Sequence, residues 1–207
     1  MEKVDFKKVL KEFYSPKNTD SWQLVDVPEM NFLMVDGEGN PNTAQSFADA
    51  IGALYPVSYA LKFMSKKELG KDYGVSMLEG LWYADDMAIF EKAEKDSYKW
   101  TLMVMQPEWI TAAMVEDAIQ QVAAKKNPAA LSKLYFKPYH DGLSLQLLHV
   151  GTFDAEAPKL KELHCTYMPA QGYEFAGHHH EIYLSDMRKV APEKLRTILR
   201  QPVKKST

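Results

Sequence analysis

The chain of 207 residues has a single cysteine, Cys165, and no long apolar run. One cysteine excludes an intramolecular disulfide and fits a reducing compartment. No stretch approaches the roughly 18 apolar residues that a membrane-spanning helix needs. Residues 1–10 are charged and lack the apolar centre of a signal peptide. We therefore expect a soluble, cytoplasmic protein without a membrane partner.

The sequence also lacks an excess of one charge. Its 25 Lys and Arg residues against 28 Asp and Glu give a formal net charge of −3. This balance argues against a nucleic-acid partner bound by bulk electrostatics. The patterns GxGxxG, GxxxxGK[ST], HExxH, CxxC and GxSxG do not occur, so dinucleotide, P-loop nucleotide and common zinc-protease sites have no support. We expect no cofactor.

Aromatic residues and methionine are plentiful. The chain has 4 Trp, 11 Tyr, 9 Phe and 11 Met, and it is 46% hydrophobic, as is normal for a globular protein. The length suffices for one large domain or two small ones. These side chains are enough to line an aromatic pocket, although protein cores use the same residue types. The composition gives no indication of the oligomeric state or of the ligand.

The hydrophobic periodicity predicts an α+β protein built from two βαββ units. Residues 1–20 are expected to form an N-terminal helix and linker, followed by one domain over 21–207 with halves of about 21–106 and 107–207. Strands are predicted at 22–27, 30–36, 73–83, 98–105, 145–153, 179–184 and 194–203, and helices at 43–64, 110–122 and 157–168. Helices would then cover one face of a largely antiparallel sheet.

Four segments depart from this regular pattern of helices and strands. Pro56 predicts a kink or a break in the helix at 43–64. Residues 131–137 fit either a helix or a strand, and 85–95 form a polar connection. Charged residues alternate with apolar ones over 194–203, which suits an edge strand.

The segment from His179 to Leu184 is the most informative part of the chain. Successive strand side chains point to opposite faces, so His179, Glu181 and Tyr183 share one face while Ile182 and Leu184 share the other. A glutamate on an aromatic wall is costly unless it is paired or hydrogen-bonded. The pattern therefore predicts that Glu181 lines a central ligand groove, on the face of the sheet that the helices leave uncovered. The alternative is a solvated sheet face with a surface glutamate.

The neighbouring histidines suggest a metal site as a second alternative. On a strand, His178 and His180 point to one side and His179 to the other. A metal bound by the first two would need a further ligand from His140, His149 or His164. We predict no metal site.

A second aromatic strand, from Leu78 to Tyr83, pairs Gly80 with Trp82. Glycine in a strand often marks the close approach of a ligand or of another group. Tyr55 and Tyr59 lie four residues apart, so they share one face of the predicted helix. The residues predicted to contact a ligand are Tyr55, Tyr59, Trp82, Trp100, Met103 and His179. For Trp82 the alternative is an ordinary core tryptophan.

Five segments in order resemble the GyrI-like small-molecule-binding family. They are residues 43–62 with the ending Tyr-Pro-Val-Ser-Tyr-Ala-Leu-Lys, 78–82, 146–151, 181–186 and 192–203. The resemblance covers about residues 20 to 205. It implies a tandem βαββ fold with a pseudo-two-fold axis. Members of this family serve as effector domains of multidrug-responsive regulators, as a gyrase-inhibitor-type protein, and as hydrolases of cyclopropane-containing genotoxins.

The resemblance also implies roles for individual residues. The buried pocket glutamate of the family corresponds to Glu181 through the Glu-x-Tyr-Leu motif, and Phe153 stands where relatives often have tyrosine. The residues before Trp22 are too few for a winged helix, so we expect no DNA-binding segment.

Three functions remain open. In a hydrolase, Glu181 would deprotonate or orient water and Tyr183 would donate a hydrogen bond to developing charge. A non-catalytic multidrug-binding protein would use the same residues to hold hydrophobic, often cationic compounds and so contribute to xenobiotic detoxification by sequestration. A topoisomerase-inhibitor-type protein is the third.

Overall fold

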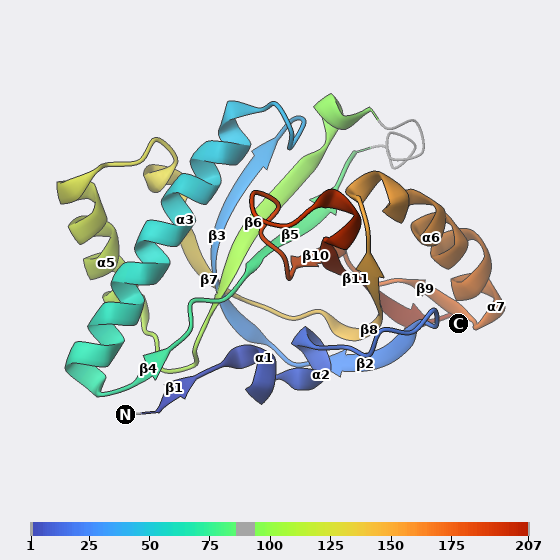
Figure 1. The fold of residues 1–207 in the computed structure, drawn as a ribbon, viewed down its shortest axis with the longest axis horizontal. Coiled ribbons are helices and arrows are strands. Elements are labelled where there is room, and N and C mark those ends of the chain that lie inside the picture. The colour runs from blue at the N-terminus through green and yellow to red at the C-terminus, as the bar shows by residue number, and fades with distance from the viewer. Residues whose placement is uncertain (1, 86–93, 207) are drawn as a thin grey trace.

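A computed structural model describes residues 2–85 and 94–206 (Figure 1). Its main sheet has nine strands, of which eight follow the spatial order β2-β8-β11-β10-β5-β6-β3-β7, while β9 pairs with β11. All these pairs are antiparallel. The strands are β2 (Gln23–Val27), β3 (Met30–Glu38), β5 (Leu78–Tyr83), β6 (Lys99–Gln106), β7 (Tyr135–Tyr139), β8 (Gly142–Val150), β9 (Tyr173–Phe175), β10 (His179–Tyr183) and β11 (Arg196–Lys205).

The topology confirms the predicted duplication. The first unit runs β3–α3–β5–β6 and the second β8–α6–β10–β11, where α3 spans Gln45–Met64 and α6 spans Ala157–Glu162. In the sheet, the strands of the second unit lie in the order β8-β11-β10 and those of the first in the mirrored order β5-β6-β3. The two units therefore meet at β10 and β5, in the middle of the sheet, as a pseudo-two-fold axis requires.

The helix α3 and the helical segment that begins with α6 cover the same face of the sheet. Figure 1 shows α3 on one side and α6 on the other, with β5 and β10 passing between them. Under α3, Phe47 packs against Trp82 and Trp100, with ring centroids 6.2 and 5.1 Å apart. A π-helical turn (Leu163–Tyr167) and α7 (Met168–Ala170) extend α6, and this second cover buries Leu163 with Leu147 and Leu199. The helix α5 (Ala112–Lys125) contacts α3.

The N-terminal segment covers the opposite face. It forms α1 (Phe6–Val9) and α2 (Lys11–Tyr14), and a short strand, β1 (Lys3–Val4), pairs with β4 (Asp72–Tyr73). The Tyr14 hydroxyl donates a hydrogen bond to Glu79, and the Glu12 carbonyl accepts one from Gln146. The face that α3 and α6 leave free is therefore covered by the N-terminal segment, contrary to the expectation that this face lines an open groove.

Three predicted elements differ from the structure. The helix α3 continues through Pro56, so the predicted break is absent, and buried residues on both sides of the proline, Leu54 and Leu61 among them, anchor the helix. The long strand expected at 73–83 is divided into β4 and β5. The last strand, β11, lies between β8 and β10 and is not an edge. Arg200 is tolerated at this buried position because it forms an ion pair with Asp141.

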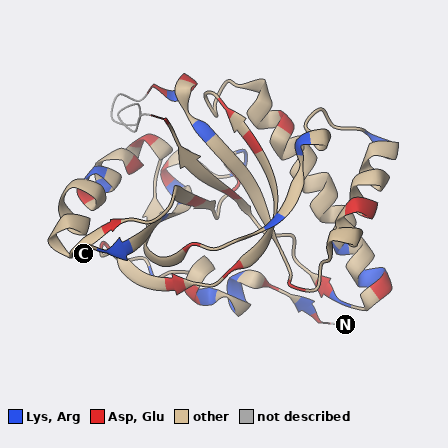
Figure 2. Cartoon of the chain, turned by 180° about the vertical axis from the view of Figure 1, so that it is seen from behind, with Lys and Arg blue, Asp and Glu red and all other residues tan. Residues whose placement is uncertain are grey.

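Other predictions were left open or fall partly outside the described residues. Residues 131–137 begin as a 3₁₀ turn (Leu131–Lys133) and continue into β7, so both predicted alternatives are partly present. Most of the predicted connection at 85–95 lies outside the described residues. Figure 2 shows basic and acidic residues interspersed along the chain. Within residues 2–85 and 94–206, no helix is long and apolar enough to cross a membrane.

Candidate functional site

The strand β10 lies between β5 and β11, where the two βαββ units meet. Cross-strand pairing places Glu181 opposite Gly80, and His179 opposite Trp82. Side chains of directly paired residues lie on the same face of a sheet. Glu181, Tyr183 and His179 therefore share a face with Trp82, and this is the face that carries α3 and α6.

A line of hydrogen bonds connects the polar atoms of this face. The indole Nε1 of Trp82 donates to the Tyr183 hydroxyl at 3.0 Å, and that hydroxyl donates to Glu181 Oε2 at 2.8 Å. The other carboxylate oxygen of Glu181 lies 3.4 Å from His179 Nε2. Burial and the neighbouring Glu181 charge raise the pKa of Tyr183 well above its usual value. The phenol thus stays protonated and holds one oxygen of Glu181 in place.

Gly80 allows this close approach. A Cβ atom at Gly80 would lie 3.2 Å from Trp82 Nε1 and 3.3 Å from the Tyr183 hydroxyl. These distances are shorter than ordinary van der Waals contacts, so any side chain here would push the two hydrogen-bonding groups apart. The glycine in the predicted aromatic strand thus makes room for a close approach within the protein.

Aromatic rings surround the hydrogen-bonded line. Phe47 of α3 stacks on Trp82, and Tyr98 meets the same indole edge-to-face with centroids 6.1 Å apart. Phe153 packs edge-on against Tyr183 at 5.8 Å. Only 13% of the Glu181 side chain is exposed to solvent. The carboxylate therefore sits at the edge of an aromatic cluster and keeps limited access to water.

The structure does not bring all the predicted ligand-binding residues together. Trp100 is fully buried, with its ring packed under Gly37. Met103 pairs with Glu79 and therefore lies on the opposite face of the sheet from Glu181. Tyr55 and Tyr59 lie on α3 with ring centroids 6.5 Å apart. Trp82 and His179 are thus the predicted ligand-binding residues that lie beside Glu181. Trp100, the strand partner of Trp82, shares this face but lies one strand farther away.

Glu156 is a residue of this region that the sequence did not single out. It ends the 3₁₀ turn Phe153–Glu156, is only 3% exposed and has one oxygen, Oε1, without a hydrogen-bond partner. Burial, together with the charge of Glu181, raises its pKa to about 10, although a hydrogen bond with Thr197 acts in the opposite direction. The sequence around it resembles an ordinary acidic helix start, so nothing in the pattern marked it.

The opposite face of β10 carries a different cluster of charges. His180 lies 3.0 Å from Glu79 and 2.9 Å from Asp141, and Arg200 lies 3.0 Å from the same Asp141 oxygen. Tyr14 completes it by donating to Glu79 at 3.0 Å. All five side chains are buried. We call these residues, Tyr14, Glu79, Asp141, His180 and Arg200, the ionic cluster.

Opposite charges set the protonation of the ionic cluster. Burial alone would lower the pKa of His180, but the carboxylates of Asp141 and Glu79 outweigh it and raise this pKa to about 9. Burial would likewise raise the pKa of Asp141, but His180 and Arg200 lower it to about 2. The cluster therefore holds His180 and Arg200 as cations against the Glu79 and Asp141 carboxylates, and its charges balance at neutral pH.

The histidines are engaged in contacts other than metal binding. His178 stacks on Tyr83 with ring centroids 4.4 Å apart, while His180 belongs to the ionic cluster. Burial and the nearby His179 lower the pKa of His164 to about 4, so it is neutral at pH 7. In the described part of the chain, no three His, Cys, Asp or Glu residues are grouped so that they could hold a metal ion.

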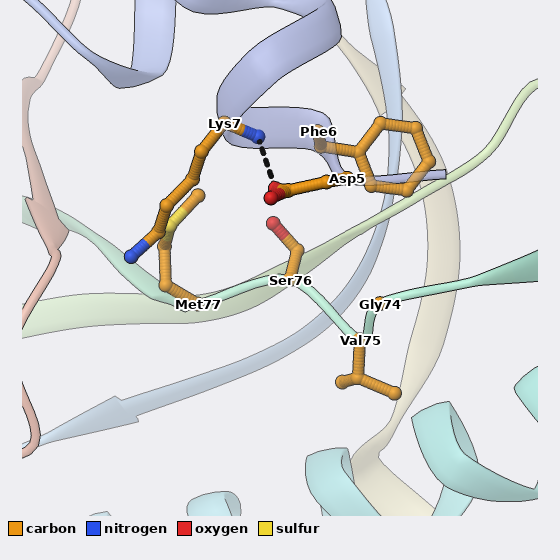
Figure 3. Close-up of a pocket in the computed structure, with 7 residues that line it drawn as sticks. All are labelled: Asp5, Phe6, Lys7, Gly74, Val75, Ser76 and Met77. Atoms are coloured by element: carbon orange, nitrogen blue, oxygen red, sulfur yellow. Dashed lines mark hydrogen bonds between the residues drawn. The ribbon is translucent and has the colours of Figure 1, made fainter. Parts of the chain in front are cut away.

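Two small cavities lie away from Glu181. The first, of about 70 Å³, lies between the N-terminal segment and residues 74–77 and contains the unpartnered hydroxyl of Ser76 (Figure 3). The second, of about 140 Å³, lies beside Asp36 and Asp49. Neither is lined by a predicted site residue, and the first is too small for an aromatic ligand.

Comparison with known proteins now identifies the class. The model of the GyrI-like small-molecule-binding domain matches residues 22–204. A solved structure of an uncharacterised conserved protein from Listeria innocua is 38% identical, with a TM-score of 0.87, and the match covers 98% of this chain and 100% of that one. No curated protein matches the chain.

Two further structures from Listeria innocua carry the name hydrolase. They are 37% and 36% identical to this chain, with TM-scores of 0.84 and 0.85, and each match covers 98% of this chain and 100% of the other. The fold and these matches define a small-molecule-binding protein with tandem βαββ units. The chain belongs to the GyrI-like family.

Proposed function

We propose that this protein binds a hydrophobic aromatic molecule beside Trp82 and Tyr183 and hydrolyses an electrophilic compound of that kind. The observation that carries the proposal is the hydrogen-bonded line from Trp82 through Tyr183 to Glu181. It fixes one oxygen of a carboxylate inside an aromatic cluster and leaves the other oxygen for a water molecule. A fixed base of this kind removes a proton from water as the water attacks.

A strained cyclopropane conjugated to a carbonyl group is the substrate class that we propose. The water oxygen forms a bond to a ring carbon, one ring bond breaks, and its electron pair moves into the carbonyl group. Glu181 takes the proton from the water. Once it is protonated, it no longer attracts the Tyr183 proton as an anion does, so the phenol is free to donate to the developing negative charge. The hydrolase names of two similar proteins support this reaction class.

The substitution Glu181→Gln tests the proposal, because it keeps the size of the side chain and removes its basicity. With a carbonyl-conjugated cyclopropane as probe, we expect turnover to fall by about two to four orders of magnitude. Mass spectrometry measures the product, which carries one added water. Binding of the neutral probe is expected to change far less. Glu174→Gln, at a half-exposed acid of β9, is the matched control.

Full turnover in Glu181→Gln would refute the role of Glu181 as the base. Absence of any hydrated product with the wild-type protein would refute the hydrolytic function itself.

A second function, the binding of a hydrophobic cation without hydrolysis, is favoured by the surroundings of Glu181. Among the residues that the structure describes, no Lys or Arg forms an ion pair with Glu181, and the basic side chain beside it is the His179 imidazole, with Nε2 3.4 Å from Glu181 Oε1. A hydrophobic cation stacked on the aromatic rings would supply a positive charge beside Glu181. In this case the protein sequesters its ligand, Glu181→Gln weakens cationic ligands but not neutral ones, and no ligand gains a water molecule.

A further inference from the structure

The position of Glu156 is set by two contacts with the residues around Glu181. Its turn begins at Phe153, whose ring packs on Tyr183. Its carboxyl group is hydrogen-bonded to Thr197, and Thr197 is the residue that pairs directly with Tyr183 across β10 and β11. Glu156 therefore reaches the face of Glu181 from the side of β11, opposite the side from which Trp82 approaches.

Glu156 has no structural task that explains its burial. It stands at the N-cap position of α6, yet its side chain makes no capping hydrogen bond. Its Oε1 atom is buried without a partner. Among the described residues, no Lys or Arg lies within ion-pair distance of its carboxyl group, although Lys159 contributes a weaker field. A buried carboxyl oxygen without a partner costs stability, so its presence calls for an explanation other than packing.

Two buried carboxylates that repel each other are costly to ionise together, and the charge of Glu181 adds to burial in raising the pKa of Glu156. The more deeply buried of the two loses more hydration on ionising, so it keeps the proton. Glu156 is 3% exposed, whereas the Glu181 side chain keeps 13% exposure and accepts a hydrogen bond from Tyr183. These surroundings suit Glu156 to the role of acid and leave the role of base to Glu181. Pairs of carboxyl groups with unequal surroundings divide acid and base roles in this way in hydrolytic enzymes.

We propose that Glu156 is the proton donor of the site and works together with Glu181. This inference rests on the proposed hydrolysis. As water attacks the ring carbon, the electron pair of the broken ring bond moves to the carbonyl oxygen, which receives the proton of Glu156, while Glu181 receives the proton from water. After the product leaves, solvent moves one proton from Glu181 back to Glu156. The substrate class is therefore an electrophile in which the electron pair of the broken bond moves to an oxygen atom, which then takes up a proton.

Infrared spectroscopy tests the protonation state without any substrate. The wild-type protein at pH 7 is expected to show the carbonyl stretch of a protonated carboxylic acid, which persists until the pH approaches about 10, the pKa of Glu156. In Glu156→Gln this band is expected to be absent. Asp154→Asn, at an exposed acid on the same turn, is the control and leaves the band unchanged. A wild-type spectrum without the band would overturn the proposal.

Turnover of the cyclopropane probe tests the chemical role. Glu156→Gln is expected to lower kcat by about 10² or more, with little change in KM. We expect the wild-type protein to lose activity at alkaline pH as Glu156 loses its proton, and this loss should be absent from Glu156→Gln. Asp154→Asn keeps the wild-type rate. Wild-type kcat in a folded Glu156→Gln variant overturns Glu156 as donor but leaves Glu181 as base. If the wild-type protein does not hydrate the probe, the proposed function fails and this inference fails with it.

Discussion

Strand β10 carries ionisable side chains on both of its faces, and the two faces deal with buried charge in different ways. His180 faces the ionic cluster, where Glu79 and Asp141 are matched by His180 and Arg200. Glu181, the next residue, faces aromatic rings and a second acid, Glu156, with only a histidine as a nearby base. In the ionic cluster each carboxylate lies beside a basic side chain, whereas among the described residues no Lys or Arg forms an ion pair with Glu181 or Glu156. A buried acid with a counter-ion supplied by the fold stabilises the structure, whereas a buried acid without one is a candidate for a functional site.

The largest effect is expected from breaking the ionic cluster. Arg200→Met leaves Asp141 buried with less compensation, and removing one partner of a buried ion pair costs about 3–5 kcal/mol. Denaturant unfolding followed by circular dichroism measures this loss. Arg196→Met, at the exposed start of the same strand, is the matched control and should cost little. Equal, small losses in both variants would show that the ionic cluster does not hold β10 and β11 together.

The two faces are also expected to differ in their response to pH. Glu156 has a pKa of about 10 in the folded protein against 4.5 when unfolded, so the stability it contributes is complete below pH 4.5 and is lost as the pH rises towards 10. His180, raised from 6.5 to about 9, begins its loss only above pH 6.5. Between pH 5 and pH 6.5, Glu156 should therefore lower the unfolding free energy by about 1.4 kcal/mol per pH unit, while His180 contributes little.

Chemical denaturation at a series of pH values measures this slope. The difference in unfolding free energy between wild-type protein and Glu156→Gln isolates the contribution of Glu156. A difference that does not change with pH would show that Glu156 titrates normally and that the two faces are electrostatically alike.

A smaller effect is expected from Tyr183→Phe. The change leaves the ring in place but removes the acceptor of Trp82 Nε1 and the donor to Glu181. A hydrogen bond to a charged group contributes about 1.5–3 kcal/mol, so the unfolding free energy should fall by roughly that amount or less. Thermal unfolding measures it, with Tyr59→Phe on α3, where the ring is half exposed, as control. An unchanged stability would mean that Glu181 does not depend on this phenol for its position.

The central strand could be predicted because period-two alternation determines which side chains share a face. This placed Glu181 and Tyr183 together, and the observed register agrees. Alternation does not say which face the helices cover, and here the N-terminal segment occupies the face that was expected to stay open. That contact is made by Tyr14 with Glu79, residues 65 positions apart, which no local pattern encodes.

Buried charge was harder to predict than buried apolar surface. Alternating charges suggested that β11 is an edge strand, but Arg200 is neutralised by Asp141, which lies on a connection far away in the sequence. Glu156 was missed for a related reason. An acid at the start of a helix is common on protein surfaces. Only the three-dimensional structure shows that Glu156 is buried and bonded to Thr197.

The glycine opposite Glu181 has a consequence for the way in which a duplicated fold acquires a single site. The two βαββ units have the same order of strands and helix, and they meet at β5 and β10. At this junction Glu181 of β10 lies opposite a residue without a side chain, Gly80 of β5. Because Gly80 on β5 has no side chain, the Trp82 indole and the Tyr183 hydroxyl can form their hydrogen bond beside it. The second unit thus carries the Glu181 carboxylate, while the first unit provides the space at Gly80 and the indole of Trp82. The backbones of the two units keep their pseudo-two-fold symmetry. The side chains do not, because the absence of a Cβ atom at Gly80 leaves room for groups from both units.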